Sequence, residues 1–575
     1  MPSPTRPIRY IEIDTDRCNN TFGSSPCTAT GEPCFQTWKG CKDKDNYVDG
    51  DPLTIRLAEP TQEVEFQTYT IPIVKSVGIS SSRVNIGGES FIGGPLGLRE
   101  EVDITILDAP HDDNLVDPYV HLRSYNPLDH GGFGGKLIAR NFLEGREVRI
   151  IDGFYGMPEE DMRVSHYIIN KVTPPGANDT FTLRLSDLLA LALDDKAQFP
   201  TASQGQLITP IAKSGSVSQI HLDVVALDFY PPTGHVTIGS EVFRYVGVDD
   251  NKLINVSRAR FNTVAAEHNV NDTVQFSPYF NGSRPVDVIR SILLGGTNIQ
   301  EEMLDYDAWV EESEVWGLTQ EVTRLITRPF GVTELIGQIT QQFGMFIWAD
   351  NRARKIKLKY SRPPWFGEKV WDITEDDHLL QGTTRLKSYP QERLSQVWVS
   401  YRQFDPTSDP NSRESYTRHR LHVDTAAQSV REYGEARITE ITSPWLTNEI
   451  DGMSLAFRTL DRSRTTPVYV TFQLAGKDAD IAIGDVINLT WRGIVDERGF
   501  AKTSVFQVIS ISEIEVNSKI EVEARNFEFT HRYAGICPND YPDYNSATDE
   551  QKHLGAFISD GDNDFDDGEP PYRII

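Results

Sequence analysis

Short segments that alternate apolar and polar residues run along most of this 575-residue chain. Alternation with a period of two puts one set of side chains on the buried face of a strand and the other set in water. The segments with this pattern or a similar β-rich composition are 63–74, 101–107, 163–172, 180–185, 236–248, 396–401, 468–474, 485–491, 504–511 and 519–524. We therefore predict a mainly β, multidomain protein with a few inserted helices.

Helical periodicity is confined to a few segments. The expected helices cover residues 186–195, 283–296, 333–344 and 448–460. Ser283 can cap the second of these helices and Thr333 the third, and Gly344 can end the third in a left-handed conformation. In the fourth helix, the residues expected to face the core are Met453, Ala456, Phe457 and Leu460.

The length of the chain allows several domains, and composition suggests where they meet. Polar segments rich in Gly, Ser and Pro separate the strand-rich units, and the C-terminal segment is strongly acidic. The predicted units are a cysteine segment (1–50), a β-rich domain (51–206), a small inserted β module (207–279), a helix-bearing α+β domain (280–362), a mixed β domain (363–532) and an acidic tail (533–575).

The chain is strongly acidic, with 84 Asp and Glu against 56 Lys and Arg and a net charge of −28. Such a surface repels phosphate, so we do not expect tight or sequence-specific binding of nucleic acid. No run of about 18 apolar residues is present, and the N-terminus lacks an apolar signal core. We therefore expect no membrane insertion and no secretion signal, and folding in a reducing cytoplasm.

One stretch has the look of a phosphate-binding loop. In DHGGFGGK, residues 129–136, His130 stands where the first glycine of the motif belongs, and Leu137 replaces the required Ser or Thr. We interpret the stretch as a flexible turn. No nucleophile-elbow, zinc-protease or dinucleotide signature occurs elsewhere, so the sequence predicts no enzymatic activity.

Four of the five cysteines, Cys18, Cys27, Cys34 and Cys41, fall in one hydrophilic segment near the N-terminus. In a reducing compartment such a group more often binds metal than forms disulfides. The gaps skip eight, six and six residues, whereas structural zinc sites commonly use closely spaced pairs. The spacing favours an iron–sulfur cluster, with zinc, disulfides or free thiols as alternatives. Cys537 is expected to be a separate thiol, with a role as a late ligand as the alternative.

The cysteine segment RCNNTFGSSPCTATGEPCFQTWKGCKDKDNY resembles the N-terminal cysteine segment of tail-tip hub proteins from long-tailed, non-contractile bacteriophages. It is also similar in kind to the cysteine-rich part of hubs in gene transfer agents. Further stretches that look like this family are residues 236–248, 255–268, 283–294, 333–358, 481–491, 520–529 and 541–575. The resemblance thus spans nearly the whole chain, and the cysteine segment is its most specific part.

This resemblance implies a structural virion protein. Such hubs are trimers that cap the distal end of the tail tube, with tube-like β-barrel domains and a four-iron, four-sulfur cluster. The ligands here would be Cys18, Cys27, Cys34 and Cys41. The implied neighbours are the distal tail protein, the tape-measure protein and the central fibre or tip proteins. The implied location is the tail tip of a virion assembled in the host cytoplasm, where double-stranded DNA passes through the channel without specific binding.

Two other classes of function remain open at this point. A receptor-binding or carbohydrate-binding tail-tip protein is one, because nine Trp and 21 Tyr could build a platform for sugars. An iron–sulfur enzyme is the other, although the sequence offers no motif for a substrate pocket beside the cysteines.

Overall fold

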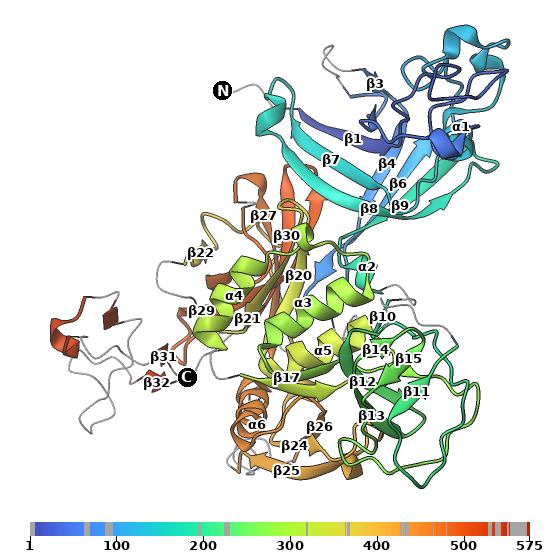
Figure 1. Ribbon diagram of the computed structural model, residues 1–575. Helices are drawn as coiled ribbons and strands as arrows, with labels where there is room; N and C mark the ends of the chain where they lie inside the picture. Colours follow the sequence, from blue (N-terminus) through green and yellow to red (C-terminus); the bar gives the residue numbers. More distant parts are fainter. Residues whose placement is uncertain are drawn as a thin grey trace.

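A mainly β architecture with several sheets and few helices confirms the predicted fold class (Figure 1). The computed structural model describes residues 6–62, 69–86, 96–193, 197–223, 230–317, 320–362, 364, 368–425, 428, 436–463, 465–478, 480–526, 532–534, 542–548, 551–552 and 572–574. Most of the predicted acidic tail and Cys537 lie outside these ranges. None of the helices in the described part of the chain is long and apolar enough to cross a membrane.

An eight-stranded sheet forms the upper lobe in Figure 1, in the order β3-β2-β1-β7-β8-β9-β6-β4. Its strands are β1 (Pro7–Thr15), β2 (Leu53–Leu57), β3 (Thr70–Ile71), β4 (Val74–Ile79), β6 (Glu101–Leu107), β7 (Glu147–Phe154), β8 (Arg163–Thr173) and β9 (Thr180–Ser186). Alternate residues point to one apolar face, as in β6, where Val102, Ile104 and Ile106 are fully buried.

The two edge strands of this sheet, β3 and β4, are joined by only two residues, Pro72 and Ile73. On one side, Ala58 N–H donates to the carbonyl of Ile71, and Val74 N–H donates to the carbonyl of Ala58. On the other side, Leu107 N–H donates to the carbonyl of Ile73. The two edges of the sheet therefore lie next to each other at residues 71–74.

The N-terminal strand belongs to this sheet and not to a separate cysteine unit. β1 pairs with β2 on one side and with β7 on the other. The boundary that we predicted at residue 50 therefore cuts through one sheet. β1 shows no simple alternation, because six consecutive residues, 8–13, are buried, and they include the charged Arg9 and Glu12. These two side chains form ion pairs with Asp152 and Arg56, which the local sequence does not reveal.

The predicted flexible turn at 129–136 is wrong, because most of it is helical. Helix α1 (Phe133–Arg140) begins after Gly132 and packs on the eight-stranded sheet. A Cβ on Gly134 would overlap the ring of Phe181 in β9. The glycines here allow a close approach of helix and sheet, and are not signs of a mobile loop.

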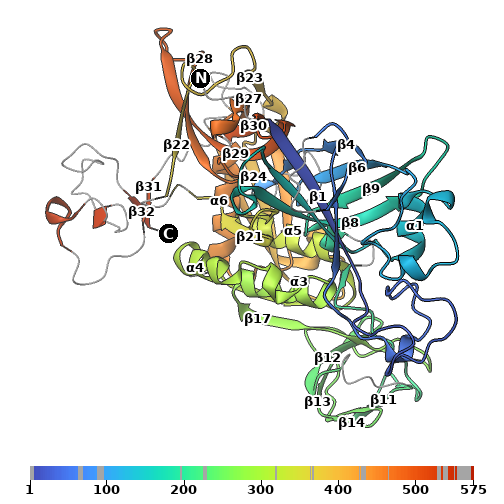
Figure 2. The ribbon, with the colours of Figure 1, turned by 90° about the horizontal axis from the view of Figure 1, so that it is seen from above.

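The small β module of residues 207–276 has its own apolar core. Its strands are β11 (Gln219–His221), β12 (Thr233–Ile238), β13 (Glu241–Val246), β14 (Val248–Asp249), β15 (Lys252–Ile254) and β16 (Gln275–Phe276). They form two three-stranded sheets, in the orders β11-β15-β14 and β13-β12-β16. The module projects to one side of the molecule in both ribbon views (Figures 1 and 2).

A central body surrounds the helices. Its helices are α2 (Ala190–Leu193), α3 (Pro285–Gly296), α4 (Tyr306–Trp316), α5 (Val332–Phe343) and α6 (Glu449–Ser463). Its strands are β10 (Gln198–Phe199), β17 (Tyr279–Ser283), β18 (Val322–Leu325), β19 (Phe330–Gly331), β20 (Met345–Asp350), β21 (Lys355–Tyr360), β24 (Gln396–Gln403), β25 (Tyr416–Val423) and β26 (Ile438–Ser443). The helices, β18, the β20–β21 hairpin and the β24–β26 sheet contribute to one apolar core, so the boundary predicted at residue 362 divides a single packing unit.

The four predicted helices exist, with local corrections. Gly344 ends α5 in the left-handed conformation, as predicted. Thr333 does not cap α5, because its hydroxyl donates to the carbonyl of Ala192. Met453 of α6 is 49% exposed, and Leu455 is buried in the core instead. The acidic helix α4 was missed, since it buries only three residues among many charges.

A seven-stranded sheet forms the C-terminal body, in the order β22-β28-β29-β30-β27-β23, with β5 added beside β29. Its strands are β5 (Ser82–Arg83), β22 (Trp371–Thr374), β23 (Arg385–Ser388), β27 (Val468–Ala475), β28 (Val486–Val495), β29 (Ala501–Glu515) and β30 (Lys519–Asn526). A separate pair consists of β31 (Arg532–Ala534) and β32 (Tyr572–Ile574). Through β5, a segment from the N-terminal part of the chain belongs to the C-terminal sheet.

Polar side chains join the upper lobe to the two lower bodies. Arg9 bonds Glu513 at 2.5 Å, and Arg354 bonds Glu147 at 2.7 Å. Asn351, in the turn between β20 and β21, donates to Glu100 at 2.7 Å. Burial, and next the charge of Asp187, raise the pKa of Glu100 to about 7. The junction therefore holds a carboxyl group that changes its charge near neutral pH.

Replacing Gly134 by Ala should destabilise the protein by about 1–3 kcal/mol, because the added Cβ overlaps the ring of Phe181. Gly135→Ala is the matched control. Its Cβ would meet only the Asp108 carboxylate, at 3.8 Å, and alanine favours the helix. Thermal unfolding of both variants tests this expectation, and equal unfolding midpoints would contradict it.

Replacing Glu100 by Gln should flatten the pH dependence of stability. The pKa of Glu100 is raised on folding, so its contribution to stability is complete below the ordinary value of 4.5 and is lost as the pH rises towards about 7. Gln keeps the neutral form, so the variant should lose less stability than the parent between these limits. Unfolding midpoints at several pH values measure the difference.

Glu147→Gln in the same junction is a control, because the pH dependence of stability that Glu147 contributes runs in the opposite direction to that of Glu100. A hydrogen bond with His166 holds the pKa of Glu147 below its usual range, so this carboxylate stabilises the fold at neutral pH and loses that effect in acid. A Glu100→Gln variant with the same pH profile as the parent would refute the assignment.

Candidate metal centre in the cysteine segment

The cysteine segment is one long loop whose two ends are held together. It leaves the sheet at the end of β1 and returns at the start of β2, where Thr15 and Leu53 are partners across the sheet. Beyond them, Gly50 N–H donates to the carbonyl of Arg17, and Asn19 N–H donates to the carbonyl of Val48. The loop is therefore closed at its neck by regular strand pairing.

All four predicted cysteines are free thiols in this loop. Cys18 lies at the neck and is buried, and Cys34 is buried further along, while Cys27 and Cys41 are half-buried. The fifth cysteine, Cys537, lies outside the described residues.

The four thiols lie within electrostatic range of one another. Burial raises the pKa of Cys34, and the charges of Cys41, Cys27 and Cys18 raise it further. Burial also raises the pKa of Cys41, to which Cys18 and Cys27 add. Close thiolates repel one another, so a cation between them would relieve this repulsion.

Two of the sulfurs accept hydrogen bonds from the backbone. Asp43 N–H donates to Sγ of Cys41 at 3.4 Å, and the Gln36 backbone acts on Cys34 in the same way. Both bonds favour the thiolate form, which is the form that binds metal. Such bonds are also among the features that tune iron–sulfur clusters.

The donor set and these hydrogen bonds fit a group held by four thiolates. The sulfur atoms, however, are not arranged as a coordination site. Across the described ranges, no three His, Cys, Asp or Glu side chains are gathered in an arrangement that could hold a metal ion. The loop thus offers suitable donors without a finished coordination site.

A stack of three side chains attaches the loop to the rest of the lobe. The ring of Phe35, next to Cys34, lies between the guanidinium groups of Arg123 and Arg140, whose carbons are 4.1 Å and 4.2 Å from the ring centroid. Arg123 also donates to the carbonyls of Pro33 (2.5 Å) and Cys34 (3.0 Å). The backbone on both sides of Cys34 is therefore fixed from outside the loop.

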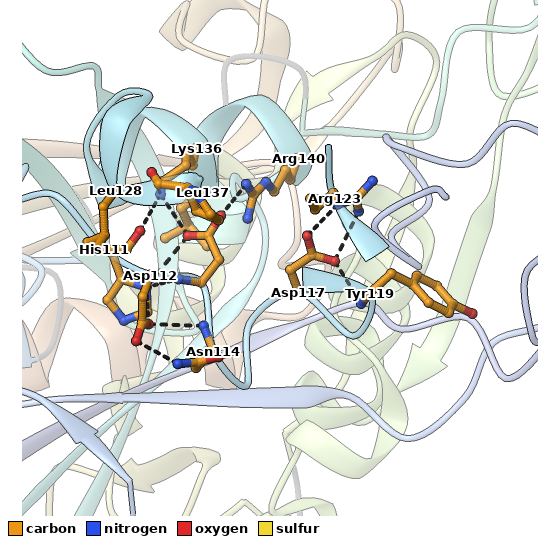
Figure 3. A network of polar contacts seen from close by, with 12 residues as sticks. His111, Asp112, Asn114, Asp117, Tyr119, Arg123, Leu128, Lys136, Leu137 and Arg140 are labelled. Atoms are coloured by element: carbon orange, nitrogen blue, oxygen red, sulfur yellow. Dashed lines mark hydrogen bonds and ion pairs between the residues drawn. The ribbon is translucent and has the colours of Figure 1, made fainter. Parts of the chain in front are cut away.

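Both arginines are held by buried carboxylates (Figure 3). Arg123 forms a two-pronged ion pair with Asp117, at 2.7 and 3.0 Å, and both side chains are almost completely enclosed. Arg140 bonds Asp113 at 2.6 Å. Each cation beside Phe35 is thus paired, so the stack brings no uncompensated charge into the lobe.

Asp113 is a second centre of this network. Lys136 bonds it at 2.8 Å from α1, and His111 Nδ1 accepts its backbone N–H at 2.9 Å (Figure 3). Burial alone would raise the pKa of Asp113, but contacts of its carboxylate with His111, Lys136 and Arg140 hold it well below its usual range. The glycine-rich stretch therefore supplies a helix whose basic residues orient the cysteine loop.

A cavity of about 330 Å³ lies between the loop and the sheet. Its lining includes Thr15, Gln36, Leu53, Val116 and Asn141. The side-chain oxygens of Gln36 and Asn141 are buried and have no hydrogen-bond partner in the structure. The space is large enough to hold ordered water against these two oxygens.

Sequence reasoning identified the four cysteines and missed the residues that position them. Asp113, Asp117, Arg123 and Arg140 are some 70 to 110 positions away along the chain from the loop that they hold. No local spacing marks them. A local signal would have been the basic residues Lys136 and Arg140 of α1, but the stretch 129–136, where this helix begins, had been interpreted as a turn.

No protein-family model and no curated protein sequence matches this chain. Among solved structures, it is similar to a tail protein from Neisseria meningitidis MC58, with 10% identity, a TM-score of 0.37, and 78% of this chain and 96% of that chain covered. It is also similar to the 43 kDa tail protein of prophage MuSo2 from Shewanella oneidensis, with 11% identity, a TM-score of 0.36, and coverage of 79% and 97%. A chain of the native gene transfer agent virion matches with 14% identity, a TM-score of 0.31, and coverage of 58% and 83%. The structures that this chain resembles thus include phage tail proteins and a gene transfer agent particle, at low sequence identity.

Replacing Phe35 by Leu should loosen the backbone around Cys34, because both cation–π contacts are lost while the two ion pairs remain. A loss of about 1–2 kcal/mol corresponds to roughly a 5- to 30-fold faster reaction of Cys34 with a thiol reagent in the metal-free protein. Mass spectrometry of each labelled cysteine measures the rate. Phe404→Leu, at an exposed aromatic after β24 and outside the cysteine loop, is the control. An unchanged rate at Cys34 in the Phe35→Leu variant would contradict the role of the stack.

Proposed function

We propose that this chain is a structural protein of a phage-type tail: a trimeric hub at the distal end of the tail tube, in the tip of the virion. The cysteine segment is the observation that carries the proposal. The stretch whose sequence resembles that of tail-tip hubs folds as one closed loop, and it gathers four free thiols into one electrostatic neighbourhood.

The arrangement of the first sheet supports a tube-like hub domain. Its edges meet at residues 71–74, and meeting edges are what closing a sheet into a barrel requires. We propose that this lobe contributes a β-barrel to a ring of three subunits. The distal tail protein, the tape-measure protein and the central fibre or tip proteins are the proposed neighbours.

The charge of the chain supports a channel role. Three copies of a chain with a net charge of −28 would surround the axis with acidic groups, and such a wall repels double-stranded DNA. We propose that DNA passes along this surface during ejection without specific binding. The role is mechanical, and it requires no catalytic residue.

We propose that Cys18, Cys27, Cys34 and Cys41 hold a four-iron, four-sulfur cluster, with zinc as the alternative. Bound there, the group would supply four metal–thiolate bonds that tie the turns of the loop together. The chain's own residues fix the neck of the loop and the backbone at Cys34, and backbone N–H groups stabilise the thiolates of Cys34 and Cys41.

Receptor or carbohydrate binding at the tail tip is the second candidate function. It is favoured by one cluster of aromatic and basic side chains on the small β module, whose rings lie 4.9–5.6 Å apart. An iron–sulfur enzyme remains the least favoured reading, since it would need substrate-binding groups beside the thiols.

Purification of the full chain without oxygen tests the proposal. We expect a brown protein with broad absorbance near roughly 400 nm, and iron and sulfide in equal amounts, about four of each per chain. Cys27→Ser should abolish the absorbance, since it removes one of the four thiolates. The measurements are the visible spectrum and the metal and sulfide content.

Cys537→Ser is the matched control, and we expect it to keep the full spectrum. Colourless protein with one zinc per chain would replace the cluster by the zinc alternative. The mass of the particle in solution tests the hub role separately. Three copies per particle support it, and a monomer at every concentration would count against it.

A further inference from the structure

Three aromatic rings meet where the small β module adjoins β17. They belong to His235 in β12, Phe261 in the loop between β15 and β16, and Tyr279 in β17, and their centroids are 4.9 to 5.6 Å apart in edge-to-face geometry. Tyr279 is 39% exposed, and the other two rings are partly exposed. We refer to these three residues as the ring cluster.

The backbone that carries Phe261 is held in an unfavourable conformation. Ala259, Phe261 and Asn262 all have positive φ angles, of 53°, 54° and 62°. This region is sparsely populated by residues with a Cβ, and it persists only where the surroundings impose it. Three such residues within four positions indicate a loop built to hold one shape.

A buried carboxylate imposes that shape. Glu241 is fully buried and accepts two hydrogen bonds from Arg258, each at 2.8 Å. It also accepts the backbone N–H groups of Ala259 and Ala266, at 3.0 and 2.9 Å, and it contacts His268 at 3.0 Å. The ring of Phe261 is thus preorganised against His235 and Tyr279 before any ligand arrives.

Two arginines flank the ring cluster. Arg244 is the cross-strand partner of His235, and Arg260 precedes Phe261. Both are exposed, and neither forms an ion pair with a carboxylate of the described residues. Burial, followed by the charges of these two arginines, lowers the pKa of His235 to about 4. The imidazole is therefore neutral at physiological pH, with two free cations beside it.

This combination selects a particular chemistry. Partly exposed ring faces carry negative charge density, which attracts the C–H groups of a sugar ring, and arginine pairs with carboxylates in a two-pronged geometry. Nucleic acid fits less well, because the rings stand edge to face and offer no parallel platform on which successive bases could stack.

We propose that the ring cluster, together with Arg244 and Arg260, binds an acidic carbohydrate, a glycan whose sugar residues bear carboxylates. The aromatic side chains pack on the sugar faces, and the arginines bind the carboxylates. The site lies where the small β module meets β17, far along the chain from the cysteine loop, and none of the residues that shape it belongs to that loop. The inference therefore stands or falls independently of the metal centre and of the trimer.

Titration calorimetry of the full chain with oligogalacturonate tests the proposal, with its methyl ester as a neutral ligand of the same sugar. We expect saturable binding of the acid, and binding of the ester weaker by about tenfold or more. Arg244→Gln and Arg260→Gln should each weaken binding of the acid by about tenfold as well. Tyr279→Leu should weaken the acid and the ester together, because it removes the contact with the sugar face.

Arg352→Gln is the matched control. It removes the same charge from an exposed arginine in the turn between β20 and β21, and it should leave the affinity unchanged. Thermal unfolding shows whether each variant is folded. NMR gives an independent readout, because a bound carboxylate should raise the pKa of His235 from about 4 in the free protein.

Several results would overturn the proposal. They are the absence of saturable binding, equal affinity for acid and ester, equal affinity for polyglutamate, tighter binding of oligodeoxythymidylate, and an Arg352→Gln variant as weak as the other two. A full chain that contains no metal and stays monomeric but still binds the glycan would refute the hub proposal. The proposal for the ring cluster would stand.

Discussion

Residues 71–74 hold the upper lobe in its shape. They pair with the end of β2 on one side and with β6 on the other, so a single short segment joins both edges of an eight-stranded sheet. Edge strands expose unpaired N–H and C=O groups, and the hydrogen bonds at residues 71–74 satisfy some of these groups at each edge. The position of β1 and β2 follows from this arrangement, and the neck of the cysteine loop follows from β1 and β2.

The cysteine loop is therefore supported in two ways that do not involve metal. Strand pairing fixes its ends, and the stack of Arg123, Phe35 and Arg140 fixes its middle. The two arginines are kept in place by carboxylates from a segment that has little regular structure of its own. A metal group would thus bind to a loop that is already largely in position, which reduces the ordering cost of binding.

Sequence reasoning succeeded where the signal is local. Period-two patterns predicted most of the long strands, and Gly344 predicted the end of α5. It failed where distant contacts decide the outcome. The glycines before and within α1 were taken for flexibility because the ring that Gly134 accommodates, Phe181, comes nearly fifty residues later. The same limit applies to the candidate site, since the four thiols are adjacent in the chain while Arg123 and Arg140 are not. Apolar residues from three of the predicted units share one core, and local composition does not reveal such packing between segments far apart in the sequence.

The chain passes between the upper lobe and the lower bodies three times in the described structure: between β4 and β5, from Leu96 into β6, and from β9 into the segment before α2. Two of these passages run beside each other, where Glu100 and Asp187 are close enough for the charge of one to raise the pKa of the other. A joint with one covalent connection can swivel, whereas three connections in parallel resist twisting together. A torque applied to the upper lobe would therefore reach the helical body with little loss. Three chain connections thus restrict rotation of the upper lobe relative to the helical body.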